Sequence, residues 1–157
     1  LNDRAAYDSK VKLMLVGDGE NRDRLITLAR ELKLEKLLIM IPACDRANDY
    51  YNAFDIFALP SRYEGFGMVA VEAQMNGLPC LLSDEFPEDV VIGADVDRLE
   101  LKEEDWLSKL MAYVDDARNQ TELNKLAVDR RTCDIDLFRD YDVGVQVGRL
   151  QEYYERF

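Results

Sequence analysis

Histidine is absent from the 157 residues of this sequence, and cysteine occurs only three times. The lack of histidine excludes Ser-His triads, histidine general bases and histidine metal ligands. Cys44, Cys80 and Cys133 are far apart and form no C-x-x-C pair, which excludes a zinc or redox motif of that type. Free cysteines without a disulfide pattern are typical of a reducing compartment, so we expect a cytoplasmic location.

Basic residues are scarce, with 20 Lys and Arg against 32 Asp and Glu. The formal net charge is −12 and the isoelectric point is near 4.5. A field of this sign repels phosphate backbones and anionic lipids, which argues against nucleic-acid binding and against direct membrane contact. Long apolar runs are missing too, and none approaches the ~20 residues that a membrane-spanning helix needs.

The remaining composition fits one globular domain over residues 1–157, with 48% hydrophobic and 33% charged residues. A chain of this length buries enough surface to fold without a disulfide or a metal. Because the sequence does not begin with Met, we expect a fragment of a longer protein.

Short apolar runs alternate with amphipathic segments along the first half of the chain. We predict strands at 12–16, 37–41, 55–59 and 79–82, and helices at 21–32, 47–53 and 67–76. Apolar strands separated by helices are typical of a parallel sheet covered on both faces. The predicted fold is therefore an α/β, Rossmann-like, three-layer parallel sheet. Beyond it we expect short extended pieces over 90–101 and a helical C-terminal tail, with helices at 103–117, 121–131 and 144–157.

Two glycine-containing loops follow predicted strands, where ligands bind in parallel sheets. Gly17 and Gly19 lie in a G-D-G turn that predicts either a tight turn or a close approach of the backbone to a phosphate or ribose. A full dinucleotide fingerprint is missing, because its third glycine would fall at Arg22.

The second loop, 60–67, ends in Gly65-Phe66-Gly67 directly before a predicted helix. Backbone amides at such a helix start favour an anion. Glu64 stands just before these amides, and Glu72 interrupts an otherwise apolar helix. Taken alone, Glu72 is either a solvated helix residue or a ligand to hydroxyl groups.

The pattern P-S-x-x-E-G-F-G-x-x-x-x-E-A over 60–73, with V-G-D-G-E upstream and G-L-P-C downstream, resembles a known family. It is similar to the C-terminal, nucleotide-sugar-binding domain of the family-4 retaining glycosyltransferases of the GT-B fold. The stretch 77–92, with Trp106 after it, is most similar to the branch that builds capsular polysaccharides and exopolysaccharides. The resemblance implies an enzyme that transfers a hexose from a nucleotide diphosphate sugar.

The same resemblance implies roles for individual residues. Glu64 would lie against the donor sugar as the catalytic residue, and Glu72 would bind the ribose hydroxyls. The base would lie near Ala43 and Cys44. The other donor-binding residues would act through their backbones: Gly17, Gly19, Gly65, Phe66, Gly67, Met68 and Val69.

The resemblance also implies partners and departures from the family pattern. No metal and no cofactor are expected. The saccharide or lipid-linked acceptor would bind an N-terminal domain that this chain lacks, and the full-length enzyme would lie at the inner face of the membrane. The family's G-R…K-G basic pair has no counterpart within 1–10, and Pro42 stands where glycine is commoner.

Other interpretations of the sequence remain open. A nucleotide-binding or interaction module without catalysis would keep the same fold. A flavodoxin-like signalling domain would leave the Glu64 and Glu72 pattern unexplained. Tyr50, Tyr51 and Phe54 are predicted to pack against the sheet rather than to form a stacking platform, and Cys80 is predicted to be a small buried hydrophobic residue.

Overall fold

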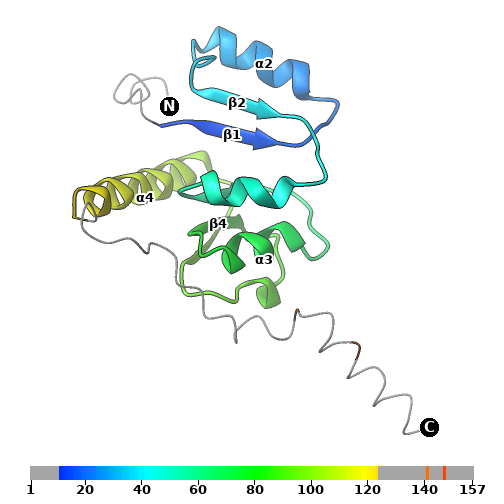
Figure 1. Ribbon diagram of the computed structural model, residues 1–157, viewed down its shortest axis with the longest axis vertical. Coiled ribbons are helices and arrows are strands. Elements are labelled where there is room, and N and C mark those ends of the chain that lie inside the picture. Colours follow the sequence, from blue (N-terminus) through cyan, green and yellow to red (C-terminus); the bar gives the residue numbers. More distant parts are fainter. Residues whose placement is uncertain (1–10, 124–140, 142–146, 148–157) are drawn as a thin grey trace, which may run out of the picture. The chain divides into compact units, whose positions relative to one another are not determined.

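The computed structural model describes residues 11–123, together with Tyr141 and Val147 (Figure 1). The chain divides into two compact units, Leu1–Tyr50 and Tyr51–Phe157, which we take in turn. Within the described residues, no helix combines the length and the apolar character needed to cross a membrane. The predicted single domain over 1–157 stays a prediction.

The first unit contains β1 (Leu13–Val16), α2 (Arg22–Glu31) and β2 (Leu38–Ile41). The two strands are parallel, and their register places Leu13 opposite Leu38. The apolar stripe that predicted α2 is largely exposed. Ala29 is buried, whereas Leu25, Leu28 and Leu32 keep 36% to 47% of their surface accessible.

The second unit is built around a parallel sheet of three short strands, in the order β3, β4, β5. β3 (Phe57–Leu59), β4 (Cys80–Ser83) and β5 (Val96–Leu99) place Cys80 opposite both Phe57 and Val96. Every residue of the central strand β4 is fully buried. Each strand pairing in the described part of the chain is parallel, which confirms the predicted Rossmann-like α/β class.

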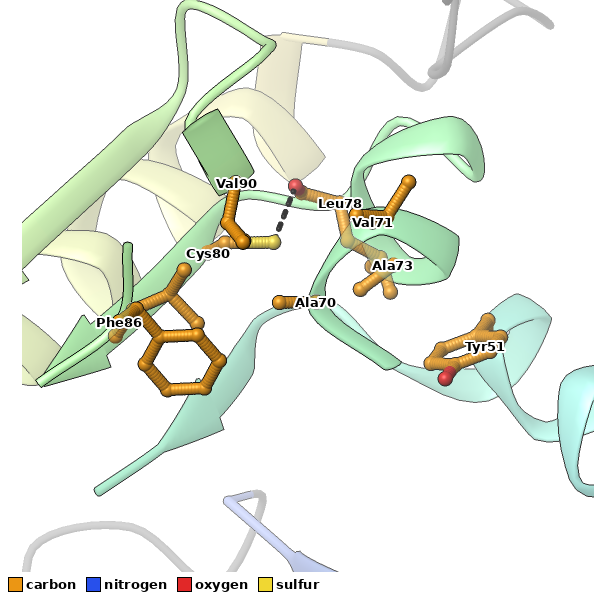
Figure 2. Packing of buried hydrophobic residues seen from close by; sticks show 9 residues of the cluster. Tyr51, Ala70, Val71, Ala73, Leu78, Cys80, Phe86 and Val90 are labelled. Atoms are coloured by element: carbon orange, nitrogen blue, oxygen red, sulfur yellow. Dashed lines mark hydrogen bonds between the residues drawn. The ribbon is translucent and has the colours of Figure 1, made fainter. Parts of the chain in front are cut away.

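Helices complete the second unit. η1 (Ala47–Ala53), a 3₁₀-helix, crosses from one unit to the next, and α3 (Met68–Met75) connects β3 to β4. A second 3₁₀ turn, η2 (Glu88–Val90), leads to β5, and α4 (Glu103–Leu123) follows. The core cluster combines α3, β4 and the residues around them (Figure 2); its buried members are Tyr51, Ala70, Val71, Ala73, Leu78, Cys80, Leu82, Phe86 and Val90.

Two sequence predictions differ from the structure. The segment 90–101 contains a regular sheet strand, β5, rather than only short extended pieces. α4 runs without a break to Leu123, where we predicted a boundary between 117 and 121. The sequence A-R-N-Q-T at that point contains no Gly or Pro that would end a helix. The predicted helices beyond Leu123 lie outside the described residues, apart from Val147.

Candidate functional site

In the first unit, the turn after β1 is tied to the loop after β2. The Asp18 carboxylate accepts a hydrogen bond from the Ala43 N–H, with 2.9 Å between Oδ2 and N. Gly17 adopts a φ of 139°, which a side chain rarely tolerates. The structure thus brings Gly17 and Gly19 close to the loop that contains Ala43 and Cys44. The Ala43 amide is therefore already hydrogen-bonded within the first unit.

In the second unit, the loop 60–67 is anchored to the end of β4. The Ser83 hydroxyl donates to the Ser61 carbonyl oxygen at 2.6 Å, and the Ser61 hydroxyl donates to the Tyr63 carbonyl at 2.9 Å. Ser83 is completely buried. Glu64 and Gly65 therefore follow a loop segment whose backbone is held by two hydroxyl groups, while Tyr63 itself is 89% exposed.

Gly67 is the residue at which α3 begins. Its φ of 79° and ψ of 53° lie in the left-handed region, and it provides no side chain to cap the helix. The first turn of α3 contains no acidic residue. The first amides of the helix, those of Met68 and Val69, belong to the N-terminal N–H groups that have no partner within a helix, and this arrangement favours an anion.

Phe86 and Arg98 support this helix start, and no motif or spacing in the sequence pointed to either residue. The Phe86 ring is 1% exposed and occupies the space next to Gly67. One Arg98 nitrogen, Nη2, donates to the carbonyl oxygens of Asp84 at 2.7 Å and Phe86 at 2.5 Å. This guanidinium fixes the turn from which the Phe86 ring projects.

Helix α3 has a buried and an accessible face. Ala70, Val71, Ala73 and Gln74 are buried, while Met68, Val69 and Met75 are 43% to 51% exposed. Glu72 is half-buried at the edge of the accessible face. Its Oε2 accepts a hydrogen bond of 2.9 Å from the Tyr51 hydroxyl. Glu72 is thus neither a freely solvated residue nor part of the core.

Phe66 is packed against a residue from far along the chain. The rings of Phe66 and Tyr141 have their centroids 5.9 Å apart and are tilted by 36°. The Tyr141 hydroxyl donates to the Asp89 carbonyl oxygen at 2.5 Å. The Phe66 ring is thus held by a contact with Tyr141 and is still 36% exposed.

Burial also sets the protonation of two groups in the core. It raises the pKa of the Cys80 thiol to about 12, with a further contribution from Asp95. Burial and the neighbouring Glu72 carboxylate raise the pKa of the Tyr51 hydroxyl, so this group remains a hydrogen-bond donor at neutral pH. Cys80 is fully buried, which confirms its predicted role as a small core residue.

The candidate donor-binding residues belong to two sets, one in each unit. Gly17, Gly19, Ala43 and Cys44 lie in the first unit, and the loop 64–69 with Glu72 lies in the second. Within residues 11–123, 141 and 147, Asp, Glu and Cys side chains nowhere gather in a group of three or more that could hold a metal ion. A metal-independent reaction stays a prediction.

Two known glycosyltransferases are similar to this chain in sequence. The amylovoran biosynthesis glycosyltransferase AmsD of Erwinia amylovora is 34% identical over 73 residues, which cover 46% of this chain and 21% of that protein. The UDP-Gal:alpha-D-GlcNAc-diphosphoundecaprenol alpha-1,3-galactosyltransferase of Escherichia coli is 25% identical over 142 residues, covering 90% of this chain and 36% of that protein.

A solved structure has the same fold. The lipopolysaccharide outer core galactosyltransferase WaaB in its apo form matches 99% of this chain and 44% of its own, with a TM-score of 0.66 and 19% identity. The matched stretches span only 21% to 25% of the first three curated relatives. The family model of the glycosyl transferases group 1 matches residues 3–126, and the chain therefore belongs to this family.

Proposed function

We propose that this chain is the donor-binding part of a retaining glycosyltransferase. It binds a nucleotide diphosphate sugar, and the whole protein transfers the hexose to a saccharide or lipid-linked acceptor in surface polysaccharide synthesis. Family membership supports the reaction class. The relatives in amylovoran synthesis and in transfer to a diphosphoundecaprenol-linked sugar support the acceptor class.

One observation carries the proposal: an anchored, accessible loop containing Glu64 and Gly65 leads directly into the uncapped start of α3, with Glu72 on the same helix. Amides at a helix start stabilise the negative charge that grows on a leaving diphosphate. Carboxylates accept strong hydrogen bonds from hydroxyl groups, which suits a sugar and a ribose. The amides therefore suit the diphosphate at the centre of a nucleotide sugar, and the carboxylates suit the sugar and the ribose on either side of it.

Each residue then has a defined task. Glu64 binds the sugar near the reacting carbon and favours the positive charge of the transition state. Glu72 binds the ribose diol, and the amides of residues 65–69 hold the sugar and the diphosphate. Gly17 and Gly19 are proposed to bind the donor through their backbones, and the base to lie along Ala43 and Cys44.

The other partners are part of the same proposal. The acceptor binds an N-terminal domain of the whole protein, the reaction uses no metal or cofactor, and the protein works in the cytoplasm at the inner face of the membrane. The 157-residue chain alone should not catalyse transfer. A transfer reaction gains about 7–11 kcal/mol from holding both reactants in place, and this chain would hold only one of them.

The test is calorimetric titration of the 157-residue chain with UDP, GDP and ADP, each with and without an attached sugar. We expect at least one nucleotide to bind in the millimolar to high micromolar range. Glu72→Ala should weaken that binding by about tenfold or more, because a lost hydrogen bond to a charged group costs about 1.5–3 kcal/mol.

Glu35→Ala is the matched control. Glu35 is an exposed glutamate in the turn before β2, at the opposite end of that strand from Ala43. Equal losses in both variants, or no nucleotide binding at all, would contradict the proposal. Nucleotide binding without transfer by the whole protein would instead favour a non-catalytic module of the same fold.

A further inference from the structure

Tyr51 connects the core of the second unit to the carboxylate of Glu72. It lies near the end of η1 and is only 6% exposed, although its hydroxyl reaches the accessible edge of α3. Figure 2 shows its ring at one end of the buried cluster, beside α3. The sequence predicts only a packing role for Tyr51, and the contact of its hydroxyl with Glu72 is visible only in the structure.

The hydroxyl has two acceptors within reach. The Glu72 Oε2 lies 2.9 Å away and the Val69 carbonyl oxygen 3.2 Å away. A hydroxyl carries one proton, and a charged acceptor at the shorter distance makes the stronger hydrogen bond. The proton of Tyr51 is therefore directed mainly to the Glu72 carboxylate.

The Tyr51 ring is itself held in place by aromatic packing. It makes edge contacts with Phe54, with ring centroids 6.0 Å apart, and with Phe57, at 5.9 Å. These contacts lie within the core cluster of the unit. A donor attached to such a ring can fix the orientation of a carboxylate, whereas a donor on a flexible surface side chain could not.

We propose that Tyr51 is the positioning residue of the ribose site. It binds one carboxylate oxygen of Glu72 so that the other, Oε1, faces the ribose diol before the nucleotide arrives. Preorganisation of this kind reduces the ordering cost of binding. This inference rests on the proposed role of Glu72 as the ribose ligand.

The experiment measures nucleotide affinity for Tyr51→Phe, Glu72→Gln and the double variant. The ligand is whichever of UDP, GDP and ADP binds the unchanged chain most tightly, together with its 2′,3′-dideoxy form. We expect Tyr51→Phe to weaken binding of the ribonucleotide by about two- to tenfold, which is the effect of losing one net hydrogen bond. Binding of the dideoxy nucleotide should not change.

The double variant should bind no more weakly than Glu72→Gln alone, because Tyr51 acts only through Glu72. Tyr113→Phe is the matched control: the Tyr113 hydroxyl donates to the Asp97 carboxylate in the same unit, so the variant removes a similar pair without touching Glu72. Binding is measured well below the unfolding temperature of every variant, so that a loss of stability cannot mimic a loss of affinity.

The outcomes separate this inference from the proposed function. If Glu72→Gln weakens binding while Tyr51→Phe does not, Tyr51 is only a core residue and the inference is wrong. Equal effects of Tyr51→Phe on ribonucleotide and dideoxynucleotide would also overturn it. If Glu72→Gln leaves ribonucleotide affinity unchanged, the ribose role of Glu72 fails, and the inference fails with it.

Discussion

A Cβ atom added to Gly67 would lie 2.2 Å from Cε1 of Phe86, a separation that real side chains do not adopt. The Phe86 ring therefore occupies the space that any other residue would need at the start of α3. The left-handed φ of 79° adds a second reason for glycine at this position. Glycine is therefore required at the start of the helix, where we propose that the diphosphate binds.

We predict that Gly67→Ala lowers the free energy of unfolding by at least about 2 kcal/mol. Left-handed backbone costs a residue with a Cβ about 1–2 kcal/mol, and overpacking costs about 1–3 kcal/mol. Urea unfolding followed by circular dichroism measures the loss. Phe86→Ala should lower the free energy of unfolding by less in the Gly67→Ala chain than in the unchanged chain, because in the variant it also removes the clash.

Gly65→Ala is the control for this prediction. A Cβ on Gly65 would meet no atom within 4 Å. Its unfolding midpoint should therefore match that of the unchanged chain, while its affinity for a nucleotide sugar should fall, since the methyl group would enter the proposed ligand space. Equal destabilisation by the two variants would contradict our account of Gly67. An unchanged affinity in Gly65→Ala would remove Gly65 from the site.

Gln74 is the buried polar residue that joins α3 to the segment before β5. Its Nε2 donates to the carbonyl oxygens of Ala70 at 3.0 Å and Val90 at 2.8 Å. Its Oε1 accepts from the amides of Ile92 at 2.9 Å and Gly93 at 3.0 Å. One side chain thus satisfies four backbone groups.

Gln74→Leu should lower the free energy of unfolding by about 2–4 kcal/mol, because each buried polar group left without a partner costs about 1–3 kcal/mol. Asn76→Ala is the comparison, since the Asn76 side chain makes a half-buried hydrogen bond of 2.9 Å to the Glu72 carbonyl. Asn76→Ala should lower the free energy of unfolding by only about 0.5–1.5 kcal/mol. Similar losses in the two variants, measured in urea, would show that the Gln74 network is not a major support.

Apolar periodicity predicted the strands β1 to β4 because their residues are almost all hydrophobic. It failed at β5, whose sequence is V-D-R-L. The polar residues of this strand find their partners far along the chain: Lys109 contacts the Asp97 carboxylate at 3.0 Å, and Arg98 binds the carbonyl oxygens of 84 and 86. Such partners are set by tertiary packing, which a local sequence pattern does not contain.

The candidate site was predictable to a similar extent. The loop containing Glu64 and the helix containing Glu72 follow from glycines, a helix start and the family pattern. The link from Tyr51 to Glu72 joins residues 21 positions apart, and no spacing rule predicts it. The same holds for the Phe86 ring beside Gly67. That Glu64 and Glu72 touch a ligand stays a prediction, whereas the contacts of Tyr51 and Phe86 with the same segment became visible only in the structure.

Cys44 offers a test of where the base binds. Cys44 is exposed and Cys80 is buried, with a pKa raised by burial to about 12. Thiolate is the form that reacts with iodoacetamide, so Cys80 should remain unlabelled at pH 8 while Cys44 reacts. Because Cys133 lies outside the described residues, the measurement uses a Cys133→Ser background and peptide mass spectrometry.

A bound nucleotide should slow the labelling of Cys44 if the base lies along the loop after β2. The decrease in the labelling rate of Cys44 should match the fraction of chains that have nucleotide bound, calculated from the Kd that calorimetry gives. Full labelling of Cys44 at saturating nucleotide would exclude the proposed base position. Labelling of Cys80 before the chain unfolds would contradict its burial. Cys44→Ser provides the unlabelled reference.

The proposed catalytic role of Glu64 is best tested in the whole protein, with the acceptor domain that we propose for it. Bond breaking in a retaining transfer leaves positive charge on the sugar ring and negative charge on the phosphate. A carboxylate near the ring fixes the sugar in the ground state and favours the cation in the transition state. Only the second interaction grows during the reaction, so its loss should lower kcat more than it raises KM.

Glu64→Gln preserves the size of the side chain but removes its charge. We expect its kcat to fall by at least about tenfold, roughly 1.4 kcal/mol, with little change in nucleotide affinity. Glu72→Gln should show the opposite division, because a ribose ligand binds the ground state and the transition state alike: its nucleotide affinity should fall while its kcat at saturating donor stays nearly constant. A normal kcat in Glu64→Gln would make Glu64 a structural loop residue. A defect confined to nucleotide affinity would instead give Glu64 the ribose role.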